Sequence, residues 1–242
     1  QVLEVGAGSG RLAFDLLLEL EARDVLPERY QILELSADLR DRQRQTFASH
    51  APHLLPRVTW LEQLPATFDG VVLANELLDA LPAHLMRWQT EGIRERGVTV
   101  DAAGSFAWKE QPATAAVLTN ARKLAEEVAP TDGYLSEISP AAAAWTASWA
   151  KILRCGALLL IDYGFPRREY YHPQRSEGTL MCHYRHHAHP DPFFLPGLQD
   201  ITVHVDFTAI AEAGTEAGLE FLGYTTQAAF LLNCGLTTIL ER

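Results

Sequence analysis

The chain has few cysteines and few basic residues. Its 242 residues include three cysteines, Cys155, Cys182 and Cys234, which are too widely spread to suggest a disulfide framework or a zinc ribbon. Twenty lysines and arginines against 31 aspartates and glutamates give a net charge of −11. That balance disfavours a protein that follows a nucleic-acid backbone and suits a cationic protein partner. No apolar run reaches the ~18 residues that predict a membrane span.

Two chemical signatures are also missing. No G-x-S-x-G elbow is present, so a serine nucleophile is disfavoured. The spacing His183-x-x-His186 is one residue short of a zinc pair, and no H-E-x-x-H occurs, so we expect no native metal. Asp191 and Asp200 could complete a metal site, but histidines that order a long loop or contact a substrate are favoured. The other histidines of this region are His172, His187 and His189.

The first ten residues, QVLEVGAGSG, predict a short buried strand followed by a glycine-rich turn. Glycines at positions 6, 8 and 10 allow positive φ and a close approach of a ligand to the backbone. The dinucleotide fingerprint is G-x-G-x-x-G, whereas here the third glycine comes one residue early. Counted from Glu4, the pattern E-x-G-x-G-x-G resembles motif I of class I S-adenosylmethionine-dependent methyltransferases. A plain tight turn is the alternative.

An acid in the expected place strengthens the nucleotide interpretation. Dinucleotide-type sites carry an acid about 20 residues after the glycine loop, where it accepts from ribose hydroxyls. The apolar segment Tyr30-Gln31-Ile32-Leu33 ends in Glu34, which lies 24 residues after Gly10. Glu34 alone could be an ordinary solvated loop acid. Together with Glu4 and the glycines, it predicts a nucleotide-like site.

Strand and helix patterns alternate along most of the chain, which predicts an α/β, doubly wound, Rossmann-like sheet. The expected strands after the first are 30–34, 57–61, 68–75, 156–164 and 219–225, and the expected helices begin at residues 11, 37, 141 and 206. Ligands in such folds bind at the carboxyl ends of the strands. Glu4 to Gly10, Glu34, Asn75-Glu76 and Asp162-Tyr163 all lie at such ends and should converge on one crevice.

We expect one domain over residues 1–242 with two departures from this alternation. Apolar and polar residues alternate from His84 to Trp108, which predicts a β-meander inserted after strand four at 83–110. Residues 164–205 show no period and are rich in proline, histidine and aromatic residues. They predict a long irregular loop, which is usually functional or ordered by a partner.

The segment Asn75 to Pro82, NELLDALP, begins where the fourth strand ends. Glu76 and Asp79 are three residues apart and would share a face if this turn is helical. Two carboxylates at the mouth of a cofactor crevice suit a cationic acceptor. Helix capping, with Asn75 as the N-cap, is an equally strong interpretation of the same residues.

Four segments together resemble the MidA family, which includes the mitochondrial complex I assembly methyltransferase and its bacterial relatives. They are NELLDALP, Asp162-Tyr163-Gly164, Gly178 to Arg185 (GTLMCHYR) and Pro196 to Phe207 (PGLQDITVHVDF). The resemblance implies a class I methyltransferase fold that binds S-adenosylmethionine. In the mitochondrial member it also implies symmetric arginine dimethylation of a complex I subunit. The last segment is far more specific than any glycine loop.

The resemblance also assigns residues. Gly6, Gly8 and Gly10 would hold the cofactor tail with Glu4 beneath it, Glu34 would bind the ribose, and Leu61-Glu62 would flank the adenine. Asn75, Glu76 and Asp79 would line the acceptor side, with Glu76 and Asp79 catalytic. The family pattern further leads us to expect a region ahead of strand one and a closing strand hairpin beyond residue 242, neither of which this sequence contains.

Three other activities stay open at this stage. One is methylation of a small molecule or of another side chain. The second is a non-enzymatic assembly chaperone that uses the β-insertion and the long loop as docking surfaces. The third, a nicotinamide oxidoreductase, is disfavoured by the shortened glycine spacing. The expected location is the cytoplasm for a bacterial protein and the mitochondrial matrix for a eukaryotic one.

Overall fold

A parallel sheet forms the centre of the computed structural model, which describes residues 1–185 and 187–240. Its strands run in the order β3-β2-β1-β4-β9, and every neighbouring pair is parallel. Their bounds are β1 (Val2–Val5), β2 (Tyr30–Leu33), β3 (Val58–Leu61), β4 (Phe68–Asn75) and β9 (Leu153–Ile161). The doubly wound class predicted from the sequence is therefore confirmed.

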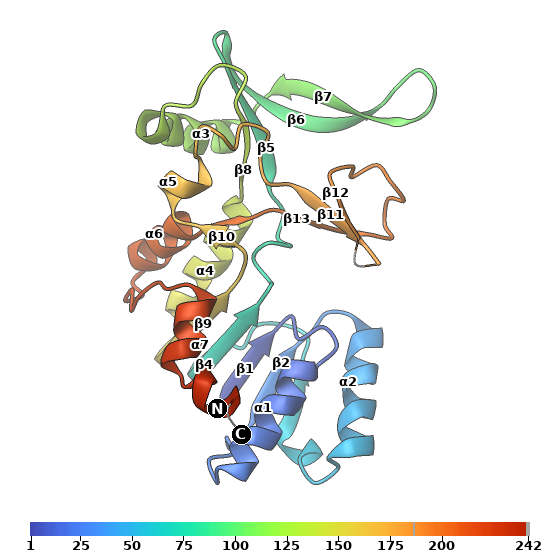
Figure 1. Cartoon of the computed structure of the whole chain (residues 1–242), viewed down its shortest axis with the longest axis vertical. Coiled ribbons are helices and arrows are strands. Elements are labelled where there is room, and N and C mark those ends of the chain that lie inside the picture. Colours follow the sequence, from blue (N-terminus) through green and yellow to red (C-terminus); the bar gives the residue numbers. More distant parts are fainter. Residues whose placement is uncertain (186, 241–242) are drawn as a thin grey trace.

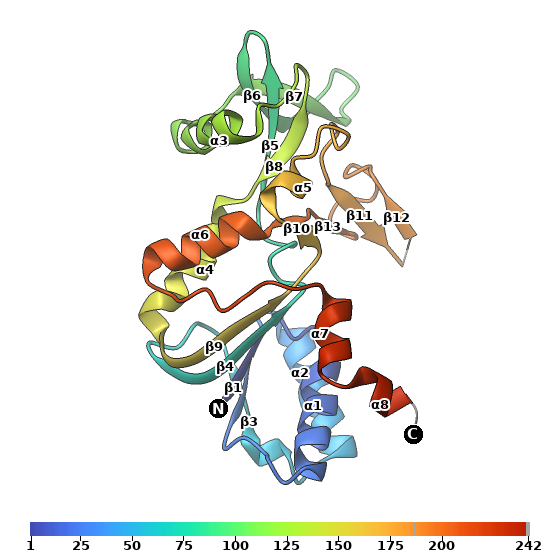
Figure 2. The ribbon, with the colours of Figure 1, turned by 60° about the vertical axis from the view of Figure 1, so that its left-hand side comes forward.

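Helices cover both faces of this sheet (Figures 1 and 2). On one face, Leu17 of α1 (Arg11–Ala22) and Phe47 of α2 (Ala37–His50) pack with Tyr30 and Ile32 of β2. On the other face, Trp149 of α4 (Pro140–Ile152) packs against β1 and β4, and α6 (Phe207–Ala217) lies along α4. The sheet is thus buried on both sides, which explains the nearly unbroken apolar runs of its strands.

The strand register aligns the carboxyl ends of the sheet. One row of paired residues crosses all five strands and consists of Leu61, Leu33, Val5, Ala74 and Leu160. The glycine loop, Glu34 and Asn75-Glu76 all follow directly after this row. These segments therefore lie at one edge of the sheet, while the crevice that we expect them to form with Asp162-Tyr163 remains a prediction.

A four-stranded antiparallel sheet follows β4 and extends away from the parallel sheet (Figure 1). Its order is β7-β6-β5-β8, and its strands are β5 (His84–Gln89), β6 (Gly92–Val100), β7 (Phe106–Pro112) and β8 (Leu135–Ile138). Helix α3 (Ala115–Val128) lies between β7 and β8 in the chain and packs on this sheet. The meander expected at 83–110 is present, but the insertion continues to residue 138.

Residues 164–205 are more ordered than the sequence pattern indicates. They form β10 (Gly164–Phe165), α5 (Arg167–Tyr170), β11 (Met181–Tyr184), β12 (His187–His189), β13 (Asp200–Thr202) and the start of β14 (Val205–Asp206). The carboxylate of Glu137, which is 1% exposed, accepts from the amides of Thr179 at 2.8 Å and Leu180 at 3.0 Å and from the hydroxyl of Tyr170 at 3.1 Å. One buried acid of β8 thus holds this segment in place. Contacts made by a single residue leave no periodic pattern in the sequence, so sequence analysis did not detect them.

His186, one half of the His183-x-x-His186 spacing that the sequence analysis weighed and disfavoured as a zinc pair, lies outside the described residues. Within residues 1–185 and 187–240, no three histidine, cysteine, aspartate or glutamate side chains are grouped so as to hold a metal ion. In the same described ranges no helix has both the length and the apolar character needed to cross a bilayer.

The strand expected at residues 219–225 is wrong. This segment has no regular structure, is mostly exposed and pairs with no strand among the described residues. Its β-forming residues, which include Phe221 and Tyr224, satisfy the local preference, but a strand also requires a neighbouring backbone to bond. The chain then forms two short helices, α7 (Gln227–Asn233) and α8 (Leu236–Leu240).

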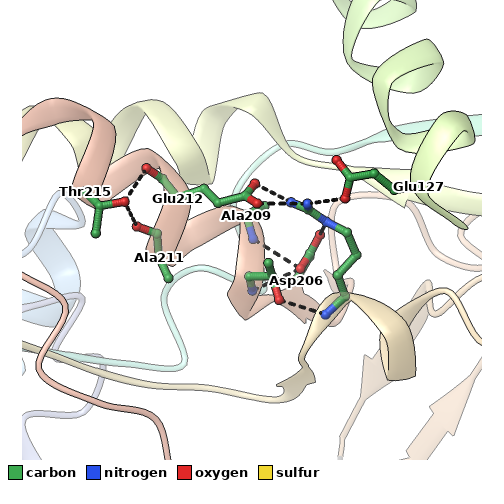
Figure 3. Close-up of polar contacts among 8 residues, drawn as sticks. Glu127, Asp206, Ala209, Ala211, Glu212 and Thr215 are labelled. Atoms are coloured by element: carbon green, nitrogen blue, oxygen red, sulfur yellow. Dashed lines mark hydrogen bonds and ion pairs between the residues drawn. The ribbon is translucent and has the colours of Figure 1, made fainter.

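An arginine with three acidic partners joins the insertion to the helices on the sheet (Figure 3). The guanidinium of Arg167 donates to Glu127 of α3 at 2.6 Å, to Glu212 of α6 at 2.5 Å and to Asp206, the N-cap of α6, at 3.4 Å. These residues line a cavity of about 220 Å³ between α3, α4 and α6. The network holds α3 close to α6.

Candidate functional site

The glycine loop connects β1 to α1 in a conformation that side chains disfavour. Gly6, Gly8 and Gly10 have φ of 71°, 53° and 74°. A Cβ at Gly10 would lie 2.7 Å from Cγ of Gln43, and one at Gly6 would lie 3.0 Å from Cδ1 of Leu77. A Cβ at Gly8 would meet nothing within 4 Å. The positive φ therefore favours glycine at all three positions; close packing adds to this at Gly10 and to a lesser degree at Gly6, whereas the space beside Gly8 is open.

Glu34 lies against this loop. Its carboxylate accepts from the backbone N–H of Gly8 at 3.3 Å and from that of Ser36 at 3.0 Å. Ser36 in turn caps α2, because its hydroxyl accepts from the N–H of Leu39. Glu34 is 8% exposed, so it lies at the loop rather than out in solvent. The structure thus brings together the glycines and the acid predicted as their partner.

Glu4 supports the loop from below. It is 3% exposed, and its carboxylate accepts from the hydroxyl of Tyr30 at 2.6 Å. Burial raises the pKa of Glu4, and the Tyr30 hydrogen bond opposes that rise. Because both groups lie within the core, Glu4 reaches the loop through the backbone of β1 and not through an open surface.

A buried glutamine, which sequence reasoning missed, holds the loop to the sheet. Gln43 is fully buried in α2; its amide donates to the carbonyl of Gly8 at 2.7 Å and accepts from the indole of Trp60 in β3 at 2.7 Å. Gln43 and Phe47, four residues apart, are the two buried positions of α2. That spacing in an otherwise charged helix was the available signal.

The predicted adenine-side residues lie at the end of β3. Leu61 pairs with Leu33 in the register of β2 and β3, and is partly buried. The side chain of Glu62 is 81% exposed and lies 3.5 Å from the guanidinium of Arg40, which also donates to the carbonyl of Glu34. Arg40 therefore links the ends of β2 and β3 on the Glu34 side of the site.

The segment after β4 is a series of turns, not the helix on which a shared face of Glu76 and Asp79 depends. Asn75, the last residue of β4, pairs with Ile161 of β9 and is partly buried. Glu76 has φ of 50°, a left-handed conformation that is uncommon for residues other than glycine. Its N–H donates to the carbonyl of Ile161 at 2.8 Å, and its carboxylate accepts from the hydroxyl of Tyr163 at 3.1 Å.

Asp162, at the end of β9, organises these turns. One carboxylate oxygen accepts from the backbone N–H of Leu78 at 2.8 Å and of Asp79 at 3.2 Å, and the other accepts from the N–H of Tyr163 at 2.8 Å. Three backbone donors are thus satisfied by one side chain. Asp162 brings Asp79 beside the end of β9, a role that its place at a strand end did not reveal.

Asp79 is the most perturbed carboxyl group of the site. It is 7% exposed, and burial, together with the negative charges of Asp162 and Glu76, raises its pKa to about 6. Its Oδ1 atom has no hydrogen-bond partner among the described residues. Asp79 is therefore a buried acceptor with unused capacity, whereas Glu76 is exposed.

The edge of the sheet thus has two halves. Around β1 and β2, a glycine loop with open space at Gly8 lies beside the carboxylate of Glu34, which suits a ribose and an amino-acid tail. Around β4 and β9, Glu76, Asp79 and Asp162 concentrate negative charge, which suits a cation. The two halves are neighbours because β1 pairs with β4.

Comparisons with known proteins identify relatives of the chain. Residues 1–225 match the family described as "Putative S-adenosyl-L-methionine-dependent methyltransferase". The chain is 27% identical to protein arginine methyltransferase NDUFAF7, mitochondrial, from Xenopus laevis, over all of this chain and 58% of that protein. It is 28% identical to the homologous mitochondrial protein of Drosophila melanogaster, over 96% of this chain and 56% of that protein.

Solved structures from Burkholderia thailandensis are more similar still. One, of an uncharacterised protein, has 51% identity and a TM-score of 0.94, over 99% of this chain and 63% of that one. Another, bound to S-adenosyl-homocysteine, has 50% identity and a TM-score of 0.93, over 99% of this chain and 61% of that one. The chain thus spans about three fifths of the length of these relatives.

Proposed function

This chain belongs to the family of S-adenosyl-L-methionine-dependent methyltransferases that it matches, and from that premise we propose that it binds S-adenosylmethionine and transfers its methyl group. The observation that carries the proposal is the pairing of the glycine loop with Glu34. Gly8 has φ of 53°, which by itself favours glycine; its N–H bonds Glu34 at 3.3 Å, and the space where a Cβ would stand is empty. Open space beside the buried carboxylate of Glu34 supports a bound nucleoside with an amino-acid tail.

The residues present fit this cofactor. Gly6, Gly8 and Gly10 would accommodate its tail at the start of α1, where the unpaired amides of a helix N-terminus attract a carboxylate. Glu34 would accept from the ribose hydroxyls, and Leu61 with Glu62 would flank the adenine. Glu4 would stiffen the strand that carries the loop, and Asn75 would lie at the boundary with the acceptor side. When bound, the cofactor supplies an electrophilic methyl group.

The acceptor that we propose is an arginine side chain of a protein, with a respiratory complex I subunit as the first candidate. Two observations support an arginine: the mitochondrial relatives are named protein arginine methyltransferases, and a group of carboxylates follows β4. A guanidinium is protonated at neutral pH, so it would lose a proton to water or to a nearby carboxylate as the N–C bond forms and the S–C bond to the departing S-adenosylhomocysteine breaks. We assign Glu76 to orienting the guanidinium, because paired carboxylates localise its charge on the nitrogens they contact. We assign Asp79 to the same role as the second carboxylate, because the charge of Glu76 acts on it and the two therefore lie close together.

Two measurements test this function. We expect calorimetry to detect S-adenosylmethionine binding but no NAD binding, and labelled cofactor to pass its methyl group to arginine peptides. Glu76→Gln should keep cofactor affinity nearly unchanged while abolishing transfer. Strong loss of cofactor binding in that variant would instead move Glu76 to the cofactor side, and transfer to a small molecule alone would change the acceptor class.

One feature favours a second function, the docking of a partner protein without catalysis. Val98 and Val100 of β6 pair with Trp108 and Phe106 of β7, so the four side chains share one face of the hairpin, and each is between 38% and 60% exposed. Exposed apolar faces of this kind often bind proteins. A chaperone role predicts partner capture that survives Gly8→Val, whereas an enzyme loses its product with that substitution.

A further inference from the structure

Tyr163 stands exposed at the carboxyl end of β9, beside the acceptor half of the site. Tyr163 is 59% exposed, although its side chain is large and aromatic. Its hydroxyl donates to Oε1 of Glu76 at 3.1 Å, and its backbone N–H donates to Asp162. Packing therefore does not hold the ring; the hydrogen bond to Glu76 is what orients it.

The backbone of Glu76 is also fixed by its surroundings. Its N–H continues the ladder between β4 and β9 by one bond, to the carbonyl of Ile161, and its backbone stays left-handed with φ of 50°. Such a conformation costs free energy in residues other than glycine and persists only where the surroundings impose it. The result is a carboxylate with one oxygen engaged by Tyr163 and the second oxygen available.

We propose that Tyr163 and Glu76 together bind the planar cation of the acceptor, with the aromatic ring stacked on a guanidinium and the second Glu76 oxygen accepting its N–H. Tyr163 is then a specificity-determining residue that touches the substrate. The inference rests on the proposed methyltransferase function and names the chemistry by which the same site selects its acceptor.

The chemistry favours a guanidinium over an ammonium group. A guanidinium is flat, weakly hydrated and able to stack on an aromatic face while it donates in its own plane, whereas an ammonium is a compact and strongly hydrated point charge. An exposed ring next to a carboxylate offers both contacts at once. Asp79 and Asp162 add negative charge nearby, and both are close enough for their charges to raise the pKa of Tyr163.

The hydroxyl of Tyr163 remains a donor at neutral pH. The hydrogen bond to Glu76, together with the negative charge of Glu76, raises the pKa of Tyr163 above its usual value. A protonated hydroxyl therefore keeps one Glu76 oxygen occupied over the whole range in which the protein would be assayed.

The test compares three variants of the full chain by calorimetry, with a Gly-Gly-Arg-Gly-Gly peptide and its lysine counterpart as probes, in the presence and absence of S-adenosyl-homocysteine. Tyr163→Leu removes the ring and the hydroxyl, Tyr163→Phe removes only the hydroxyl, and Tyr224→Leu is a control at another exposed tyrosine. Circular dichroism melts check that each variant is folded.

We expect Tyr163→Leu to weaken arginine-peptide binding about tenfold and Tyr163→Phe to weaken it about threefold. The control should change nothing, the lysine peptide should lose less than the arginine peptide, and the affinity for S-adenosyl-homocysteine should stay the same in all variants. Equal arginine-peptide affinity in Tyr163→Leu and in the natural chain would overturn the proposal. So would the absence of arginine-peptide binding to the natural chain.

The design separates this inference from the function on which it rests. If S-adenosyl-homocysteine binds but Tyr163→Leu has no effect on the arginine peptide, the proposed guanidinium-binding role of Tyr163 is wrong and the methyltransferase function stands. If no cofactor binds, the methyltransferase function fails, and the titrations without cofactor still decide whether Tyr163 and Glu76 bind arginine.

Discussion

The side-chain amide of Gln43 donates to the carbonyl oxygen of Gly8 at 2.7 Å, so helix α2 holds the glycine loop from behind. Gln43→Leu would leave that carbonyl and the indole of Trp60 without their partner; both hydrogen bonds are only partly buried, so the cost is about 1 kcal/mol for each group. We expect the free energy of unfolding to fall by roughly 2 kcal/mol and the affinity for S-adenosylmethionine to fall with it. Urea unfolding and calorimetry measure the two effects.

Gln45→Leu is the matched control, since Gln45 lies two residues further along the same helix and is exposed. It should leave both quantities almost unchanged. Equal effects of the two substitutions would mean that the Gln43 contact does not shape the loop.

Gly8→Ala tests whether the open space at the loop belongs to a ligand. Gly8 and Gly104 both have positive φ, 53° and 82°, and a Cβ at either position meets nothing within 4 Å. Alanine at each should therefore cost a similar backbone strain of about 1 kcal/mol. We expect thermal melts to show the same small loss for both, and calorimetry to show lost cofactor affinity for Gly8→Ala alone. If Gly104→Ala, in the turn between β6 and β7, weakened binding as much, the loop would not be the cofactor site.

Stability should depend on pH through Asp79. Its pKa is about 6 in the folded protein and returns to about 3.9 on unfolding. Between these values the folded protein binds more protons than the unfolded chain, so stability falls as the pH rises from about 4 to 6 and stays lower above that range. Asp79→Asn keeps an acceptor oxygen without the charge. We expect it to be more stable than the natural chain at pH 8 by at most about 3 kcal/mol, and nearly equal at pH 4.

Urea unfolding at a series of pH values checks this prediction. The informative quantity is the slope of the free energy of unfolding against pH between pH 4 and 6, which should be more steeply negative in the natural chain than in Asp79→Asn. Parallel curves for the two proteins would show that Asp79 does not titrate in this range.

Arg167→Met should loosen the attachment of the insertion. The side chains of Arg167 and Asp206 are only 13% and 11% exposed, so removing the cation leaves a buried carboxylate without its charge partner. Such a loss typically costs about 3 kcal/mol. We expect a lower melting temperature and faster proteolysis within α3, which Arg167 reaches through Glu127.

The neighbouring Arg168 is exposed, so Arg168→Met provides the control and should change the unfolding free energy by less than about 0.5 kcal/mol. Similar melting temperatures for both variants would indicate that the network of Figure 3 contributes little.

The sequence predicted the parts of the site that depend on local spacing. Three glycines after an apolar strand predicted the loop, and the spacing from Gly10 predicted Glu34 as its partner. In the structure the two are adjacent, because the N–H of Gly8 donates to the carboxylate of Glu34. The resemblance to the MidA family, drawn from NELLDALP and three other segments, is confirmed by the family match over residues 1–225. The roles assigned to individual residues remain predictions.

The sequence could not predict contacts made across long stretches of chain. Gln43 reads as one polar residue in a charged helix, and only the packed fold shows its two partners. Asp162 contacts the turn at Leu78 from 84 residues away. The strand expected at 219–225 does not form, because a local preference for β structure cannot supply the neighbouring strand that pairing requires.

The long separation of β4 from β9 has a consequence for how the protein folds. The two strands are neighbours in the sheet, yet the whole antiparallel insertion and α4 lie between them in the chain. Contacts between distant residues form later, since closing a long loop costs more entropy than closing a short one. Nascent chains should therefore complete the Gly8 and Glu34 region first. The turn that carries Glu76 acquires its final geometry when β9 docks, so on the proposed function an intermediate stalled before that step should bind cofactor without recognising an acceptor.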